Sequence, residues 1–274
     1  MATALIILVA SLLAAWLFLR WFERANVFQP SRSLWSDPSV LGIPFEDVRL
    51  TTADGVELSA WFLPAAPESP RGDLAVLISH GNGGNISHRL SLCGALAELG
   101  LNILLYDYRG YGRSSGRCSE HGTYLDAEAA LNWLNTRGFN DSAVLAYGES
   151  LGGGVAAELA RRRPNLRALV LQSTFTSIPD IGEELFPFLP VRMVGVIRYD
   201  TRAKLPEIRV PILILHSRDD TLIRFHHAER NFEAANPPKW LREIRGDHNE
   251  QPGSDPEGFR TAILELLTNT GGRR

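Results

Sequence analysis

The sequence predicts an α/β protein whose mostly parallel sheet carries helices on both faces. Three observations predict it: short apolar runs alternate with helical stretches from about Phe45 onward, turn residues bound each run, and one run turns abruptly into a helix at residues 148–152. Strands buried in a parallel sheet are continuously apolar, and their alternation with helices is typical of this class. The 274 residues, 45% hydrophobic and 22% charged, supply enough apolar material for one large core.

The predicted elements follow in order along the chain. The first two strands alternate apolar and polar residues around Asp54-Gly55, which is a hairpin signal. Eight strands are expected in all, at residues 47–52, 56–63, 74–79, 102–106, 143–147, 168–171, 210–215 and 240–244. Helices are expected at residues 87–99, 120–135, 151–163, 226–235 and 256–267. An antiparallel pair followed by β-α-β repeats therefore predicts a mostly parallel, eight-stranded sheet.

Residues 174–205 do not fit this alternation. They are rich in phenylalanine, proline and valine but contain no clear strand, and they lie between the sixth and seventh predicted strands. Two interpretations remain open. The segment covers a pocket as a minimal lid, or it forms an additional helix that completes the core.

The N-terminus predicts a transmembrane helix. Residues 2–19 carry no charge, and 18 helical residues span roughly 27 Å, close to the hydrocarbon thickness of a bilayer. Trp16 and Trp21 fall where an aromatic belt lies, and Arg20 follows at the boundary. A cleaved signal peptide is the competing interpretation, but it calls for basic residues before the apolar run and an A-x-A-like site after it. We expect a retained single-pass anchor over residues 1–24 and one catalytic domain over residues 25–274.

The orientation of this anchor is predicted from its flanking charges. No Lys or Arg precedes the span, whereas Arg20, Arg24 and Arg32 follow it. The positive-inside bias therefore places the catalytic domain in the cytoplasm. The opposite topology, with the domain on the periplasmic or lumenal side, remains open because folded domains are translocated despite a few arginines.

Charge and cysteine content exclude several classes of protein. A net charge of −3 argues against a nucleic-acid partner, and the basic run at residues 161–163 precedes Pro164, as at a helix C-terminus. Cys93 and Cys118 form no C-x-x-C pair. His226 and His227 lack the spacing of a zinc site and are expected to be surface or packing residues. We expect neither a metal nor an organic cofactor.

The most informative motif is G-x-S-x-G at residues 148–152, between the strand at 143–147 and a glycine-rich helix. Such a turn strains the backbone so that the serine hydroxyl projects clear of the sheet, and its flanking glycines avoid collisions with neighbouring elements. The motif predicts Ser150 as a nucleophile.

A serine hydroxyl needs a base within hydrogen-bonding reach, and the base needs an acid that orients it. An acidic pair, Asp219-Asp220, follows the strand at 210–215, and His248 follows the last predicted strand. Loops after the carboxyl ends of parallel strands meet at one edge of a sheet, where open α/β sheets bind their ligands. The chain order Ser, Asp, His therefore predicts a catalytic triad that contains Ser150 and His248.

Acyl transfer also needs donors for the oxyanion. The backbone N–H of Leu151, directly after the nucleophile, is one candidate. The second is expected from the loop at residues 80–85, where three glycines in four residues exceed what a plain β-α turn needs. We predict the backbone N–H of Asn82, with Gly83 as the alternative.

Together these motifs resemble the α/β-hydrolase superfamily, and more narrowly its membrane-anchored Bem46-like branch, which includes α/β-hydrolase domain-containing depalmitoylases and lysophospholipid lipases. The resemblance covers residues 28–267 and rests on the loop at 80–85, the segment 106–114, the serine motif, the acid loop and residues 246–249. It implies an α/β-hydrolase fold, places the acid on Asp220, and gives Asp107 and Arg109 scaffolding roles. Ser217, Arg224 and Asp247 depart from the usual loop residues.

The sequence thus predicts a membrane-tethered serine hydrolase that cleaves carboxylic esters or thioesters through an acyl-enzyme. The anchor and the apolar residues 186–197 indicate small-molecule or lipid-like ester substrates. A serine peptidase of the same fold and a non-catalytic binding protein on this fold remain as alternatives.

Overall fold

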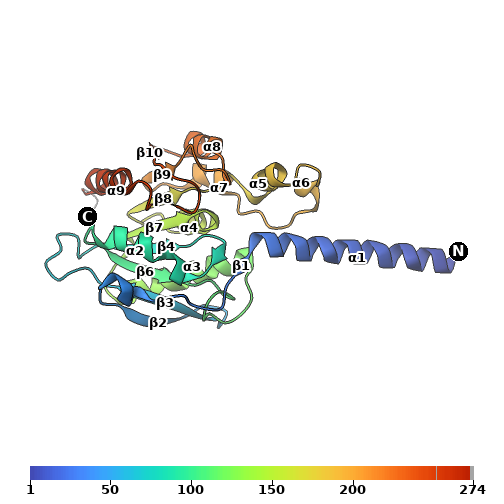
Figure 1. Ribbon diagram of the computed structural model, residues 1–274, viewed down its shortest axis with the longest axis horizontal. Helices are drawn as coiled ribbons and strands as arrows, with labels where there is room; N and C mark the ends of the chain where they lie inside the picture. Colours follow the sequence, from blue (N-terminus) through green and yellow to red (C-terminus); the bar gives the residue numbers. More distant parts are fainter. Residues whose placement is uncertain (251, 272–274) are drawn as a thin grey trace.

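The computed structural model describes residues 1–250 and 252–271, and its central element is an eight-stranded sheet (Figure 1). The strands run in the order β10-β9-β8-β7-β4-β6-β3-β2. Their bounds are β2 Glu46–Thr51, β3 Glu57–Leu63, β4 Ala75–Ser79, β6 Asn102–Tyr106, β7 Val144–Glu149, β8 Ala168–Gln172, β9 Ile212–His216 and β10 Lys239–Glu243. Only the β2–β3 and β3–β6 pairs are antiparallel. The predicted α/β-hydrolase fold and its mostly parallel sheet are confirmed.

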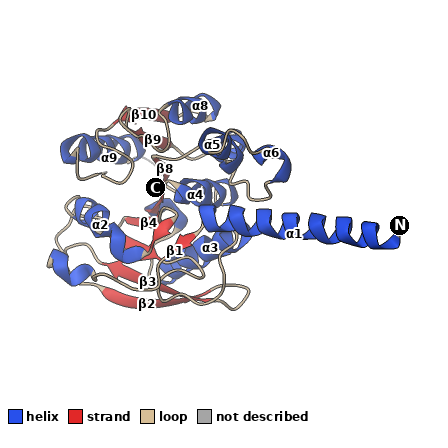
Figure 2. Ribbon diagram, turned by 45° about the vertical axis from the view of Figure 1, so that its right-hand side comes forward, coloured by secondary structure: helices blue, strands red, loops and turns tan. Residues whose placement is uncertain are grey.

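Helices cover both faces of this sheet (Figure 2). The helices that follow α1 are α2 Leu90–Ala97, α3 Glu120–Thr136, α4 Leu151–Arg162, α5 Ile178–Leu185, α6 Val191–Val194, α7 Thr201–Lys204, α8 His226–Ala234 and α9 Pro256–Thr270. Short 3-10 helices lie at Pro38–Leu41, Ile86–Arg89, Asp141–Ala143 and Leu205–Glu207. The helix predicted at 87–99 is therefore split into a 3-10 turn and α2.

Two buried clusters hold the layers together, one on each face. Along β4, Ala75 and Leu77 belong to the cluster that contains α3, α4 and α8, whereas Val76 and Ile78 belong to the cluster that contains α2 and α9. This alternation follows from the two-residue period of a strand, which turns successive side chains to opposite faces. Because both faces are covered, the strand is apolar at every one of these positions.

Helix α1, Ala2–Val27, leaves the domain and carries the N-terminus at its far end (Figure 1). It is long and apolar enough to cross a membrane, and none of its most apolar 18-residue window is buried, as in a membrane anchor or a signal sequence. The predicted boundary after residue 24 falls inside the last turn of α1, because Val27 and Phe28 already belong to the buried core.

A short parallel pair of strands that the sequence did not predict connects the end of α1 to the loop after β4. Strand β1, Gln29–Pro30, pairs with β5, Gly83–Gly84, in the loop after β4. Two-residue strands leave no periodic pattern to detect, so only the folded chain shows this pairing.

Residues 174–205 form α5, α6 and α7 and no strand. Helices α5 and α6 lie on the side of the domain from which α1 leaves, as Figures 1 and 2 agree. Helix α7 contacts α4 and α8, and Thr201 and Leu205 are fully buried. The segment therefore combines both predicted interpretations, since its last part completes the core while α5 borders the cavity described below.

Candidate active site

The serine motif forms a strained turn between β7 and α4. Ser150 has φ 53° and ψ −117°, a backbone conformation that residues other than glycine rarely adopt. Its N–H donates to the Gln172 carbonyl at 2.9 Å. A Cβ on Gly148 would lie 2.4 Å from the Gly152 carbonyl oxygen, and one on Gly152 would lie 1.9 Å from the Ser79 carbonyl oxygen. The glycines are thus required sterically, and they allow the serine to stand at the carboxyl edge of the sheet.

The fold brings three of the predicted site residues into one hydrogen-bonded chain. His248 Nε2 lies 3.1 Å from Ser150 Oγ, and His248 Nδ1 lies 2.8 Å from Asp220 Oδ2. These residues follow β7, β9 and β10, and each is less than a tenth exposed. The neighbouring Asp219 is exposed, so the carboxylate that meets His248 is that of Asp220.

The surroundings of Asp220 favour its ionised form. Its Oδ1 accepts hydrogen bonds from the backbone N–H groups of Leu222 at 3.0 Å and Ile223 at 2.8 Å. Burial alone would raise the pKa of Asp220, but the hydrogen bonds from His216 and His248 hold it well below its usual range. An ionised Asp220 only accepts, so His248 Nδ1 carries the ring proton and Nε2 is free to accept the proton of the serine hydroxyl.

Both predicted oxyanion donors line the same cavity as Ser150. Within residues 1–250 and 252–271, no acceptor is found for the backbone N–H of Asn82 or of Leu151. The Asn82 carbonyl accepts from Tyr111 Oη at 2.8 Å and from the Gln29 N–H at 3.1 Å. These contacts fix the peptide unit between Asn82 and Gly83, and the preceding unit, which carries the Asn82 N–H, has its Gly81 carbonyl 2.7 Å from His80 Nδ1.

The cavity has a volume of about 710 Å³ and is chemically divided. Its apolar lining comes mostly from the last turn of α1, from residues 175–186 and from the acid loop, with two leucines at the starts of α2 and α4: Val27, Leu92, Leu151, Phe175, Ile178, Ile181, Leu185, Phe186, Leu222 and Ile223. Its polar lining gathers mostly around the serine motif, the start of α2 and the loops after β4 and β10, with two further residues at the end of α1: Asn26, Gln29, Asn82, His88, Arg89, Ser91, Glu149 and Asn249. Such a cavity fits a ligand with one apolar and one polar part.

Two supporting contacts were missed at the sequence level. Arg89 Nε lies 2.6 Å from Glu149 Oε2, and Arg89 Nη2 donates to the Gly83 carbonyl at 3.2 Å, which ties the loop at residues 80–85 to the serine turn. Thr174 Oγ1 donates to the Ser150 carbonyl at 2.6 Å and holds the strained turn from the adjacent strand end. The spacing of these residues in the chain does not indicate either contact, because only the order of the strands in the folded sheet brings the two residues of each pair together.

The residues given scaffolding roles lie behind the site and do not line the cavity. Asp107 Oδ1 accepts from the Ile86 N–H at 3.0 Å. Arg109 is held between two carboxylates, with Nε 2.8 Å from Asp126 Oδ1 and Nη1 2.7 Å from Asp54 Oδ2. These contacts fix the loops that flank the cavity.

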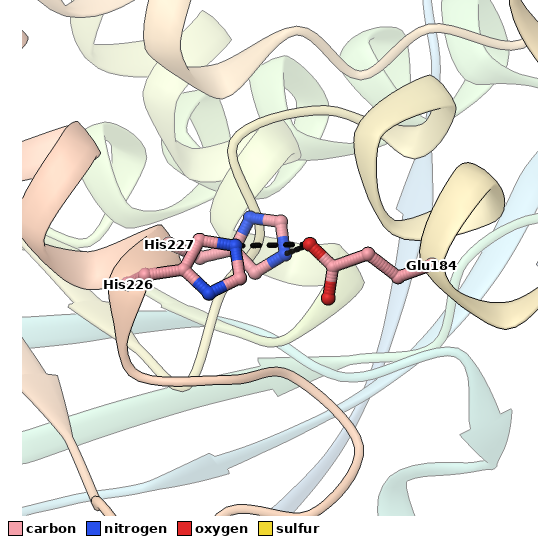
Figure 3. A group of neighbouring side chains, drawn as sticks. All are labelled: Glu184, His226 and His227. Carbon is pink, nitrogen blue, oxygen red and sulfur yellow. Dashed lines mark ion pairs between the residues drawn. The ribbon is translucent and has the colours of Figure 1, made fainter.

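Among the described residues, one group brings three potential metal-ligating atoms within 4.8 Å of one another: Glu184, His226 and His227 (Figure 3). Glu184 Oε1 lies 2.9 Å from His226 Nε2 and 3.2 Å from His227 Nε2. His227 Nδ1 lies 3.2 Å from the Thr176 backbone N–H, which donates to it, and 2.9 Å from Thr176 Oγ1, so this nitrogen is engaged within the protein. We call this group the lid latch, because it joins α5 to α8.

The lid latch predicts a pH dependence of stability. Burial lowers the pKa of His227 to about 4, from an ordinary value of 6.5, although the carboxylates of Glu184 and Asp180 oppose this shift and His226 and His216 add to it. Between these two values the unfolded chain binds a proton that the folded chain does not, so stability falls as the pH falls through this window. We expect the melting temperature of the detergent-solubilised protein to be lower at pH 5 than at pH 7.

The matched variant for this measurement is His227→Gln, which keeps a polar side chain of similar reach but does not titrate. The difference in stability between pH 7 and pH 5 is expected to shrink by about 1–2 kcal/mol in this variant. An unchanged pH difference would show that other groups carry the effect.

Comparisons with known proteins give the family. The sequence model of Hydrolase_4, described as serine aminopeptidase, S33, matches residues 70–198. The chain is 37% identical to the uncharacterized protein Rv2307c of Mycobacterium tuberculosis, over 97% of this chain and 94% of that protein. It is 36% identical to the alpha/beta hydrolase domain-containing protein WAV2 of Arabidopsis thaliana, over 78% of this chain and 76% of that protein.

A solved structure shares the architecture. The Pyrococcus furiosus esterase Pf2001 superposes with a TM-score of 0.73 at 23% identity, covering 89% of this chain and 98% of the esterase chain. The fold and the relatives agree on the class of protein: the chain belongs to the α/β-hydrolase family. Its fold matches that of the Pyrococcus furiosus esterase, and the relatives confirm the resemblance to α/β-hydrolases drawn from the motifs.

Proposed function

We propose that this protein is a serine hydrolase that cleaves carboxylic ester or thioester bonds through an acyl-enzyme. The observation that carries the proposal is the hydrogen-bonded chain from Asp220 through His248 to Ser150, which opens on a cavity of about 710 Å³. The distances of 2.8 and 3.1 Å lie within the range that proton transfer between such groups requires.

Each residue has one role in the proposed reaction. Ser150 Oγ forms a bond to the acyl carbon while His248 Nε2 takes the hydroxyl proton, and the N–H groups of Asn82 and Leu151 donate to the carbonyl oxygen as it becomes negative. The imidazolium then gives its proton to the departing alcohol or thiol. Water attacks the acyl-enzyme through the same base, and the acid leaves with Ser150 restored. Asp220 orients the ring and stabilises its charged form.

The lining of the cavity supports an ester rather than a peptide substrate. The family model that matches this chain is described as a serine aminopeptidase, so peptide cleavage is the second candidate. An aminopeptidase holds the substrate's charged amine, for which a free carboxylate is suited. Glu149 is the acidic side chain in the described lining, and Arg89 already pairs with it at 2.6 Å. The divided cavity instead suits a lipid-like ester or an acylated thiol.

Helix α1 supports the further proposal that residues 1–24 form a retained single-pass membrane anchor for the catalytic domain, residues 25–274. The most apolar 18-residue window of α1 has a mean hydropathy of 2.5. Arg20 and Arg24 follow its uncharged part, which favours a cytoplasmic catalytic domain. Substrates that partition into the bilayer would then reach the site at high local concentration.

Covalent labelling tests the nucleophile. A fluorophosphonate probe is expected to label the wild-type protein with one equivalent and to leave Ser150→Ala unlabelled. The matched control is Ser91→Ala, since Ser91 is an exposed serine that lines the same cavity. Retained labelling of Ser150→Ala, or its loss in Ser91→Ala alone, would overturn the assignment.

Relative rates separate the two candidate functions. The ester proposal expects faster turnover of p-nitrophenyl esters than of aminoacyl amides, and the peptidase candidate expects the reverse. Wild type and His248→Ala are assayed side by side, so that turnover independent of His248 is subtracted from both rates.

A further inference from the structure

The segment between α5 and α7 presents an unusual apolar surface to solvent. We define residues 185–196 as the lid tip. Within it Phe188 is 97% exposed, Met193 86%, Val196 63%, Leu185 49% and Leu189 36%. Five large apolar side chains exposed within twelve residues exceed what scattered surface positions need, and such a patch marks an interaction site.

The lid tip is held against α1. Phe186 stacks edge-on with Phe22 at a centroid separation of 5.3 Å. Glu23 Oε1 accepts from the Val196 N–H at 2.7 Å and from the Ile197 N–H at 2.8 Å. Arg20 donates to the carbonyl of Val194 at the same level. These contacts fix the height of the lid tip along α1.

This height coincides with the predicted membrane surface. The residues of α1 before Arg20 are uncharged, so a bilayer spanned by that part has its surface close to Arg20. The lid tip contacts α1 between Arg20 and Glu23, which is within one helical turn, about 5 Å, of this level. On α1 itself, Phe18 is 58% exposed and Trp21 64% exposed, and these rings continue the apolar surface.

The charges of the lid tip do not oppose membrane contact. Arg192 is paired with Glu183 at 2.7 Å and also with Asp180, both on α5. Its charge is therefore compensated by two carboxylates of α5, and no acidic residue occurs in residues 185–196. A surface with apolar side chains and no net negative charge suits the interface of a bilayer.

We propose that the lid tip is a bilayer-contacting surface that inserts Phe188 and Met193 into the leaflet beside α1. This proposal rests on the proposed membrane anchor. Leu185 and Phe186 line the catalytic cavity, and so do Asn26 and Val27 at the end of α1. The inserted surface thus borders the apolar part of the cavity, and an acyl chain passes from the leaflet to Ser150 without crossing bulk water.

Fluorescence quenching tests the insertion without any need for activity. The full-length protein is reconstituted in phosphatidylcholine/phosphatidylglycerol vesicles, with an environment-sensitive fluorophore on Phe188→Cys or Met193→Cys. The native Cys93 and Cys118 are buried and do not compete for the label. The matched control is Glu68→Cys, an exposed position in the loop before β4, at the opposite edge of the sheet from the site.

Acyl-chain-brominated lipids are expected to quench the two lid-tip fluorophores at least twofold more than the fluorophore at Glu68→Cys. Equal quenching at all three positions would overturn the proposal. Because this readout is independent of catalysis, it also decides the proposal if the protein proves to have no esterase activity.

A second measurement tests the coupling to substrate. The double variant Phe188→Asp/Met193→Asp is expected to hydrolyse a long-chain ester embedded in vesicles about tenfold more slowly than wild type. Its rate with a short water-soluble ester is expected to stay within twofold of wild type, since neither residue lines the cavity. Equal losses with both esters, or no loss with the embedded ester, would contradict the proposed passage from the leaflet.

Discussion

Replacing Asp220 with asparagine is expected to lower kcat for ester hydrolysis by about 10⁴-fold, as the corresponding change does in serine proteases. Asp220 Oδ2 accepts from His248 Nδ1 at 2.8 Å. An asparagine amide can donate at that position, which favours the tautomer with the proton on Nε2. That nitrogen then cannot take the proton of Ser150 Oγ, although it lies 3.1 Å away. KM is expected to change little, since Asp220 does not line the cavity.

The adjacent carboxylate supplies the control for this experiment. Asp219 differs from Asp220 by one position in the chain but is exposed, so Asp219→Asn removes the same charge without touching the histidine. We expect its kcat to stay within about twofold of wild type. A larger loss of kcat in Asp219→Asn than in Asp220→Asn would show that Asp219, and not Asp220, is the acid that orients His248.

Replacing Gly152 with alanine is expected to destabilise the fold and abolish activity together. The added Cβ would lie 1.9 Å from the Ser79 carbonyl oxygen and 2.8 Å from that of His80. Both atoms belong to the backbone where β4 ends, and Ser79 cannot move without disturbing its pairing with Gly148 of β7. We expect a loss of about 3 kcal/mol, the upper end for overpacking, and therefore a fall of about 6–12 °C in melting temperature.

Gly72→Ala is the matched control for the elbow glycine. Its Cβ would meet the Ser69 carbonyl oxygen at 3.4 Å, an ordinary contact, and its backbone does not lie in the left-handed region. The same chemical change is expected to alter stability by less than about 1 kcal/mol. If both variants melted at the same temperature, the steric account of the serine turn would be wrong.

Much of the fold was predictable because most strands and helices follow from the pattern of apolar residues within a short segment of the chain. The strands at 74–79, 102–106 and 168–171 lie within a residue or two of β4, β6 and β8, since a strand buried on both faces must be apolar throughout. The helix at 87–99 was predicted too long, because the Asn85 side chain caps a 3-10 turn, accepting from the Ser87 N–H, and α2 begins only after it. Capping by a side chain overrides the apolar pattern on which the prediction depended.

The candidate site was predictable for a different reason. The turn around Ser150 needs glycines at fixed spacing, and loops after parallel strands necessarily meet at one edge, so Ser150 and His248 were identifiable from chain order alone. The choice between Asp219 and Asp220 rested on the family resemblance. The folded loop distinguishes them physically, since it buries Asp220 beside His248 and leaves Asp219 in solvent.

By itself, the sequence determined the α/β class, the strained serine turn and an apolar N-terminal helix, because each depends on the composition and spacing of residues that are neighbours in the chain. Only the tertiary structure decided which distant residues support the site. Arg89 meets Glu149, Glu184 meets His227, and the lid tip lies against α1. Such contacts depend on how the helices pack on the sheet, and the periodicity of apolar residues within one segment does not indicate where another segment lies.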